Sequence, residues 1–175
     1  MKILSKKKAL VELKKLKNNF REIIKENYEF KAKDCSKCNQ TCCLDAKFVN
    51  VHITKLEAIL IHDHLREKYP QEKAKQINEK VKEVIERFDI ARNMENSSHT
   101  FPCPFFEQGS GCLIHEVKPI ACIQHACYEK SEDLPPEKLQ AEIERKIERL
   151  NERTYGKPSR WFPLPIWIAL TKEEG

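Results

Sequence analysis

The sequence predicts a mainly α-helical fold, a small helical domain in which two irregular cysteine-rich segments are brought together by metal. Apolar side chains recur at helical spacing in four separate segments of the 175-residue chain. Glycine is scarce, with only four residues, and a helical protein tolerates this better than one with many tight hairpins. All eight cysteines lie outside the helical stripes, although a structural thiol usually sits on an apolar face.

The first predicted helix covers residues 6–31. Its apolar positions at helical spacing are Leu10, Leu13, Leu16, Phe20, Ile23 and Ile24. Residues 1–33 carry ten Lys and one Arg against four Glu, a net charge of +7, while the remaining residues sum to −2. Because the glutamates interrupt the basic run, we interpret residues 1–33 as a basic amphipathic helix with a solvated face. We therefore expect nucleic acid to bind weakly at most.

Residues 34–175 are predicted to form the cysteine-cluster metal-binding domain, with a C-terminal helix and a tail that contains the tryptophans. Residues 47–53 alternate weakly and are expected to be extended. The segment Thr54-Lys-Leu-Glu57 is a capping box, which begins a second helix that runs to about Lys68, before Pro70. A third helix follows, with an apolar stripe formed by Ala74, Ile77, Val81, Val84, Ile85, Phe88 and Ala91.

Residues 95–134 are predicted to be mostly loop, because prolines and glycines punctuate them. Pro136 suits the first turn of a last long helix, and Gly156 is a natural terminator for it. That helix has an apolar face formed by Leu139, Ile143, Ile147 and Leu150. The apolar stretch 161–170 is short and interrupted by Pro163 and Pro165, so the tail is expected to pack back on the core without a further helix.

The N-terminus and the hydropathy pattern indicate the compartment. The basic start is not followed by an apolar run, so no secretory signal is expected. No segment approaches the roughly 20 apolar residues of a membrane span. The expected location is the cytoplasm, where thiols stay reduced, and this argues against disulfides.

The cysteines form two groups, and all eight are candidate metal ligands. Four thiols lie within nine residues, and the first pair has the spacing with which one turn presents two sulfurs to a metal. Thiolates suit zinc, copper(I) and iron–sulfur clusters. The second group is spread over a loop that bound metal would order. The groups are Cys35, Cys38, Cys42 and Cys43, and then Cys103, Cys112, Cys122 and Cys127.

The spacing leaves the kind of centre open. It matches neither the bacterial ferredoxin run nor a paired C-x2-C zinc ribbon. Cys42 and Cys43 are adjacent, and neighbouring side chains in an extended segment point to opposite sides. The first group then supplies about three ligands where a structural site needs four. We therefore expect metal to tie residues 35–43 to residues 103–127, either as two four-ligand centres or as one cluster with spare thiols.

Three motifs in this order resemble the YkgJ-type cysteine-cluster family, also called the CxxCxxCC domain. The motifs are Cys35-x2-Cys38-x3-Cys42-Cys43, Cys103-Pro104-Phe105-Phe106, and Gly111-Cys112-Leu113-Ile114-His115-Glu116 with Lys118-Pro119-x2-Cys122. The resemblance covers roughly residues 34–127. This chain departs from the pattern by one extra residue before Cys42, by His115 where the family often has Tyr, and by Lys118 where it often has Arg.

The resemblance implies a small cytosolic protein of unassigned cellular role that chelates zinc or iron. It favours an iron–sulfur cluster, such as a 4Fe–4S cluster, slightly over zinc. A related cysteine motif occurs in flagellin lysine methylases, which look like iron–sulfur proteins. The alternative function is therefore a metal-dependent enzyme or an accessory subunit for protein modification, with a protein partner.

The histidines and the remaining polar residues add little. His62 and His64 are two residues apart on a predicted helix, so they face different directions and do not share a metal. We interpret these two, with His52 and His99, as surface or ordinary polar residues. His115 and His125 lie beside cysteines and are candidates to bind the metal or to hydrogen-bond a ligand sulfur. No nucleotide-binding loop and no catalytic residues are identified.

Overall fold

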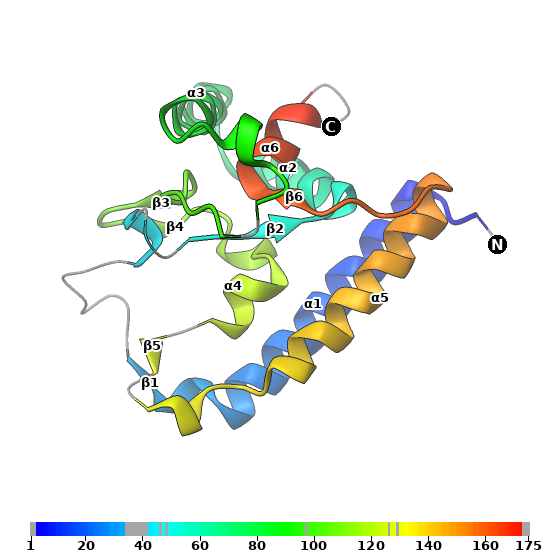
Figure 1. Ribbon diagram of the computed structural model, residues 1–175. Helices are drawn as coiled ribbons and strands as arrows, with labels where there is room; N and C mark the ends of the chain where they lie inside the picture. Colours follow the sequence, from blue (N-terminus) through cyan, green and yellow to red (C-terminus); the bar gives the residue numbers. More distant parts are fainter. Residues whose placement is uncertain are drawn as a thin grey trace. The chain divides into compact units, whose positions relative to one another are not determined.

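The computed structural model describes residues 3–33, 42–45, 47, 49–96, 98–125, 127–128 and 130–172 (Figure 1). At Lys33 and Cys127 it describes the backbone only. Within this part of the chain, six α-helices, α1 to α6, contain most of the residues. The strands are each two residues long and form two-stranded sheets. The mainly α-helical prediction is confirmed.

The chain divides into two compact units, each built from two stretches of sequence. The first unit comprises Met1–Asn39 and Lys118–Ser159. The second comprises Gln40–Val117 and Arg160–Gly175. Segments far apart in the sequence therefore share a hydrophobic core within each unit.

The first unit is built on two long helices, α1 (Lys6–Asn27) and α5 (Glu137–Tyr155), which pack side by side (Figure 1). The Ser5 hydroxyl caps α1 by accepting a hydrogen bond from the Lys8 amide. The helix α5 ends at Gly156, whose φ of 67° is the left-handed conformation that glycine adopts readily. The apolar residues that α1 and α5 bury are Ala9, Leu13, Phe20, Ile24, Ile147 and Leu150.

Shorter elements complete the first unit. The helix α4 (Ile120–Gln124) packs against both α1 and α5. The strand β1 (Ala32–Lys33) pairs antiparallel with β5 (Cys127–Tyr128), with Lys33 opposite Cys127. An ion pair of 2.9 Å between Lys31 Nζ and Asp133 joins the turns η1 (Glu29–Lys31) and η6 (Ser131–Asp133) that flank this pairing.

The second unit is organised around α2 (Lys55–Lys68), which is buried on nearly all sides from Leu56 to Ile61. The predicted capping box is confirmed, because the side chains of Thr54 and Glu57 each accept a hydrogen bond from the other's backbone amide. The helices α3 (Gln71–Arg87) and α2 both pack against α6 (Leu164–Leu170). Part of the core here is a cluster of Val49, Val84, Ile90, Phe101 and Ile166.

The helix α6 was not predicted, and its prolines explain why. The prediction took Pro163 and Pro165 as interruptions of the apolar stretch. In the structure, Pro163 is the N-terminal cap and Pro165 stands in the first turn, where a missing N–H costs no helical hydrogen bond. The strand β6 (Phe162–Pro163) before this helix pairs with β2 (His52–Ile53), and Leu164 N donates to Val51 O at 2.8 Å. The prediction that the tail packs back on the core is thus confirmed.

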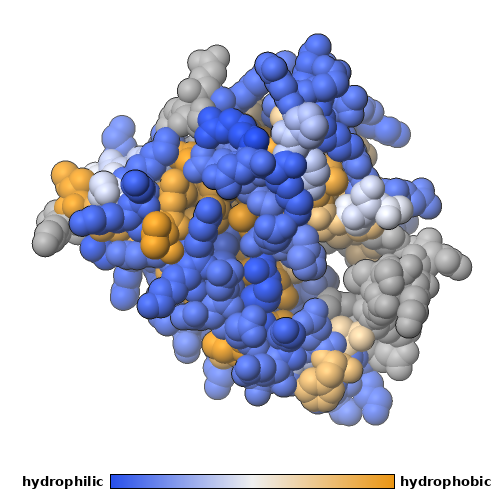
Figure 2. Space-filling model, turned by 180° about the vertical axis from the view of Figure 1, so that it is seen from behind, coloured by the Kyte–Doolittle hydropathy of each residue, from blue (hydrophilic) through white to orange (hydrophobic). Residues whose placement is uncertain are grey.

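The surface is dominated by hydrophilic side chains on the face that Figure 2 shows, with hydrophobic residues scattered among them. The large apolar side chains that are exposed come from several elements, and they include Ile3, Val11, Phe30 and Leu170. Among the described residues, no helix has the length and apolarity needed to span a membrane.

Candidate metal centre

The eight predicted ligands divide evenly between the two units. Four belong to the first unit, namely Cys35, Cys38, Cys122 and Cys127, and four to the second, namely Cys42, Cys43, Cys103 and Cys112. Cys35, Cys38 and the side chain of Cys127 lie outside the described residues. The other five thiols are half-buried, and the backbone shows how the four in the second unit are placed.

Three cysteine-bearing segments of the second unit are joined by backbone hydrogen bonds. Cys103 N donates to Cys43 O at 2.6 Å, although the two residues are 60 apart in the sequence. Phe106 N donates in turn to Cys103 O at 3.4 Å. The strand β3 (Phe106–Glu107) pairs antiparallel with β4 (Gly111–Cys112), which sets Phe106 opposite Cys112. The backbones of these segments therefore adjoin one another.

Buried aromatic residues fix the loop that carries Cys103. Phe101 and Phe105 are both fully buried. Phe101 N donates to Val49 O at 2.9 Å, and Phe105 O accepts from Leu113 N at 2.8 Å. Cys103 itself packs against the core cluster that contains Phe101. A side chain on each side of Cys103 thus anchors the segment in the core, and the thiol position follows from that packing.

The adjacent pair Cys42 and Cys43 lies in a 3₁₀ turn, η3 (Cys42–Leu44). The prediction for these two thiols assumed extended backbone, and that assumption is wrong. In a 3₁₀ helix, successive side chains are turned by about 120° around the axis and not by 180°. Adjacency therefore does not by itself direct the two thiols to opposite sides.

A charged group from α2 pairs with Glu116, four residues after Cys112 in the sequence. Lys68 Nζ is 2.5 Å from Glu116 Oε1. The hydrogen bond from Lys68 holds the pKa of Glu116 below its usual range, and the same bond is the largest cause of a raised pKa at Lys68. The electrostatic interaction with Cys112 also contributes to the raised pKa of Lys68.

His64 is buried beside this ion pair. Its side chain is 9% exposed, and its Nδ1 lies 4.0 Å from Glu116 Oε2, which is too far for a hydrogen bond. Its Nε2 has no hydrogen-bond partner among the described residues. No local sequence pattern identifies Lys68, Glu116 and His64 as one group, because 48 residues separate Lys68 from Glu116.

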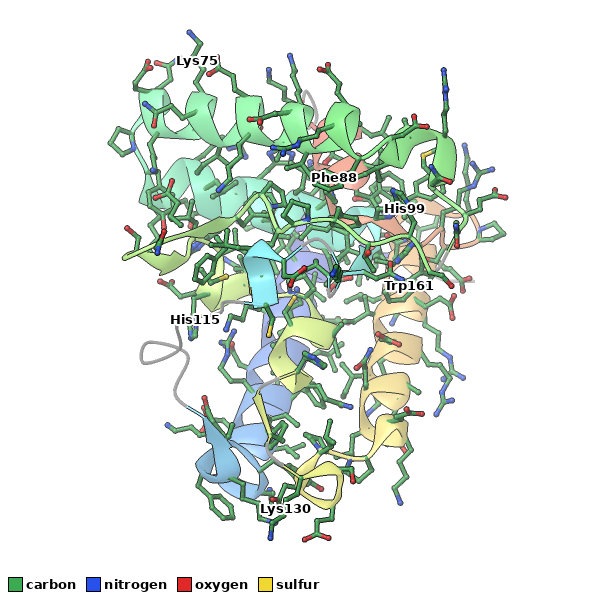
Figure 3. All side chains as sticks on the ribbon, turned by 60° about the vertical axis from the view of Figure 1, so that its left-hand side comes forward. Lys75, Phe88, His99, His115, Lys130 and Trp161 are labelled. Carbon is green, nitrogen blue, oxygen red and sulfur yellow. The ribbon has the colours of Figure 1, made fainter. Side chains whose placement is uncertain are left out.

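The other histidines differ in their burial. His62 and His64 were predicted to be surface or ordinary polar residues, and the surface alternative is wrong, because they are only 7% and 8% exposed. They do face different partners, as expected, because His62 Nε2 lies 2.9 Å from Ile168 O. His115, on η5 (His115–Val117), is exposed (Figure 3), and His125 is exposed at the end of α4.

The first unit positions its cysteines by α4 and by the β1–β5 pairing. Cys122 lies on α4, which follows Pro119 as its N-terminal cap. Cys127 stands opposite Lys33 in the β1–β5 register, and Cys35 follows Lys33 by two residues in the sequence. The β1–β5 pairing thus joins the backbone of Cys127 to the end of β1.

The described side chains do not by themselves form a complete metal site. Among them, no group of three or more His, Cys, Asp or Glu side chains is arranged to hold a metal ion. The donor chemistry fits a thiophilic metal, since every cysteine side chain in the described part of the second unit is half-buried and borne on adjoining segments. Comparisons with protein-family models, with curated proteins and with solved structures gave no match.

Proposed function

We propose that this chain is a cytoplasmic metal-binding protein that holds an iron–sulfur cluster or zinc through its clustered cysteines. The observation that carries the proposal is the hydrogen bond from Cys103 N to Cys43 O. It supports the expectation that the proximal cysteine segment and the distal loop meet. The resemblance to the YkgJ-type family slightly favours the iron–sulfur cluster.

The adjoining backbones of the second-unit cysteine segments support a shared ligand set. Metal binding would have to draw the four thiols together, because as they stand they are not gathered around one point. Gathering several thiolates costs electrostatic energy, which a bound cation offsets. Cys42, Cys43, Cys103 and Cys112 are four soft donors, the number that a structural zinc or a cubane cluster requires. The Lys68 ammonium supplies one positive charge that interacts electrostatically with Cys112, and a nearby positive charge generally stabilises a thiolate.

The division of the cysteines favours two centres over one cluster with spare thiols. Each unit holds four cysteines, so each would complete its own four-ligand set. Cys35, Cys38, Cys122 and Cys127 would then serve the first unit. Two four-ligand centres predict twice the metal content that a single centre predicts.

Anaerobic purification followed by a visible spectrum and by iron, sulfide and zinc analysis tests the proposal. A brown protein with iron and sulfide supports the cluster, and a colourless protein with stoichiometric zinc supports zinc. A folded protein with neither metal, even after anaerobic reconstitution, refutes the proposal. Chelation is expected to raise the protease sensitivity of residues 103–127, because that loop lacks its own apolar periodicity.

Single Cys→Ser variants test which thiols share a centre. Loss of metal from Cys43→Ser and from both Cys103→Ser and Cys112→Ser supports one ligand set in the second unit. Gln108→Ala is the matched control, because this exposed residue lies in the same β3–β4 hairpin and offers no thiol. Full metal content in the Cys103 and Cys112 variants, with loss in the Cys35 and Cys38 variants, contradicts the shared set.

A further inference from the structure

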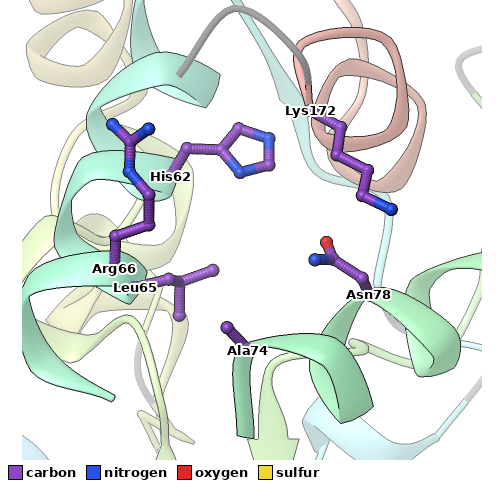
Figure 4. Close-up of a pocket in the computed structure, with 6 residues that line it drawn as sticks. All are labelled: His62, Leu65, Arg66, Ala74, Asn78 and Lys172. Carbon is purple, nitrogen blue, oxygen red and sulfur yellow. The ribbon is translucent and has the colours of Figure 1, made fainter. Parts of the chain in front are cut away.

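A pocket of about 140 Å³ opens in the second unit among α2, α3 and the end of α6. No cysteine is among its described lining residues, so it is distinct from the proposed second-unit ligand set. Because a water molecule takes up about 30 Å³ in the liquid, the pocket has room for roughly four to five waters or for one small polyatomic ion. Its lining residues are His62, Leu65, Arg66, Ala74, Asn78 and Lys172 (Figure 4).

The charge of the pocket is positive. Arg66 and Lys172 line it, and among the residues that the structure describes no acidic side chain does. Asp63 pairs with Arg66 at 2.5 Å through the Nη2 nitrogen, which leaves further guanidinium N–H donors for a ligand. Arg66 and Lys172 each lower the pKa of His62 by their charge, so both cations lie near the imidazole. An anion in this pocket would therefore lie between two cationic residues that line opposite sides of it (Figure 4).

His62 gives the pocket an acceptor as well as these donors. Its Nε2 lies 2.9 Å from Ile168 O, and because a carbonyl oxygen only accepts, Nε2 carries the hydrogen. The other nitrogen, Nδ1, lies on the side of the ring that faces the pocket (Figure 4). Burial is the largest cause that lowers the pKa of His62, so at neutral pH the ring is neutral and Nδ1 bears a lone pair.

We propose that this pocket is a binding site for inorganic phosphate in its hydrogen phosphate form. Arg66 and Lys172 pair with the charged oxygens, and the Asn78 amide donates a further hydrogen bond. The P–OH group donates to Nδ1 of His62, which fixes the orientation of the ion. Sulfate has the same shape and charge but no O–H at neutral pH, so its oxygen lone pairs would face the lone pair of Nδ1.

Isothermal titration of the full chain at pH 7.5 with sodium phosphate and with sodium sulfate, at equal ionic strength, tests the site. Phosphate is expected to bind at least about ten times more tightly than sulfate, because sulfate leaves a buried acceptor unpaired. No phosphate binding overturns the proposal. Equal affinity for the two ions overturns it too, because a merely cationic patch would not distinguish them.

Matched variants separate the pocket from the general charge of the protein. Arg66→Gln and Lys172→Gln are each expected to weaken phosphate binding by about ten-fold, since each removes one charge-assisted contact. Lys138→Gln removes the same charge from an exposed position of α5 in the other unit, and it should bind phosphate like the wild type. Circular dichroism verifies folding, and the exposed Lys172 gives a second test if Arg66→Gln does not fold.

His62→Gln examines the acceptor directly. A glutamine amide can turn either its oxygen or its N–H groups toward the ligand, so the preference for phosphate over sulfate should shrink toward equality. An unchanged preference for phosphate over sulfate in this variant would show that His62 does not accept a hydrogen bond from the P–OH group. Metal content is expected to stay the same in all these variants, so failure of the phosphate site would be distinguishable from failure of the proposed metal centre.

Discussion

The hydroxyl of Thr54 is predicted to contribute measurably to the stability of the second unit. Its oxygen accepts a hydrogen bond from Glu57 N at 3.4 Å, while Glu57 Oε2 accepts from Thr54 N at 3.1 Å. Both residues are at most 1% exposed, so water cannot replace a bond that is lost. An N-cap hydroxyl contributes about 0.5–2 kcal/mol, and burial places this one in the upper half of that range. We expect about 1–2 kcal/mol for this hydroxyl.

Two variants at this position isolate the hydroxyl. Thr54→Ser keeps the oxygen and loses a buried methyl group, which costs about 0.8 kcal/mol. Thr54→Ala loses the methyl and the oxygen, so it should unfold about 1–2 kcal/mol more easily than Thr54→Ser. Urea unfolding followed by far-ultraviolet circular dichroism gives both free energies, with the same metal loading in each sample. Equal stability of the Ser and Ala variants would refute the capping argument.

Three further perturbations have definite expected outcomes. Phe101→Ala should destabilise the protein by about 3–5 kcal/mol in the same assay, because it leaves a cavity in the core, and a loss below 1 kcal/mol would contradict the packing described for Phe101. Lys68→Met should raise the pKa of Glu116 toward its ordinary value, measured by carboxyl NMR titration, and an unmoved value would exclude the ion pair. Because the pKa of His62 is lowered in the folded chain, the unfolded chain binds a proton at this imidazole more readily. The free energy of unfolding should therefore fall as pH drops below about 6.5. His62→Gln should flatten that part of the stability profile, and a wild-type slope would count against the prediction.

Local sequence patterns are sufficient to place the long helices. The capping box at Thr54 and the glycine at position 156 each depend on a single turn of helix. As predicted, Thr54 begins α2 and Gly156 ends α5. Of the apolar stripe predicted for the first helix, Leu13, Phe20 and Ile24 are buried in α1, whereas Ile23 is exposed. These features depend on neighbours three or four positions away, and a period of that length can be recognised in one sequence.

The tertiary structure alone decided which cysteine segments meet and which polar residues surround them. The bond between Cys43 and Cys103 spans 60 residues, and no local pattern encodes a contact of that separation. The burial of His62 and the helical role of Pro165 in α6 likewise depend on how α2 and α6 pack together. The physical reason is that such contacts are selected by the burial of apolar surface over the whole unit, against the entropy of closing long loops, and not by the spacing of neighbouring residues.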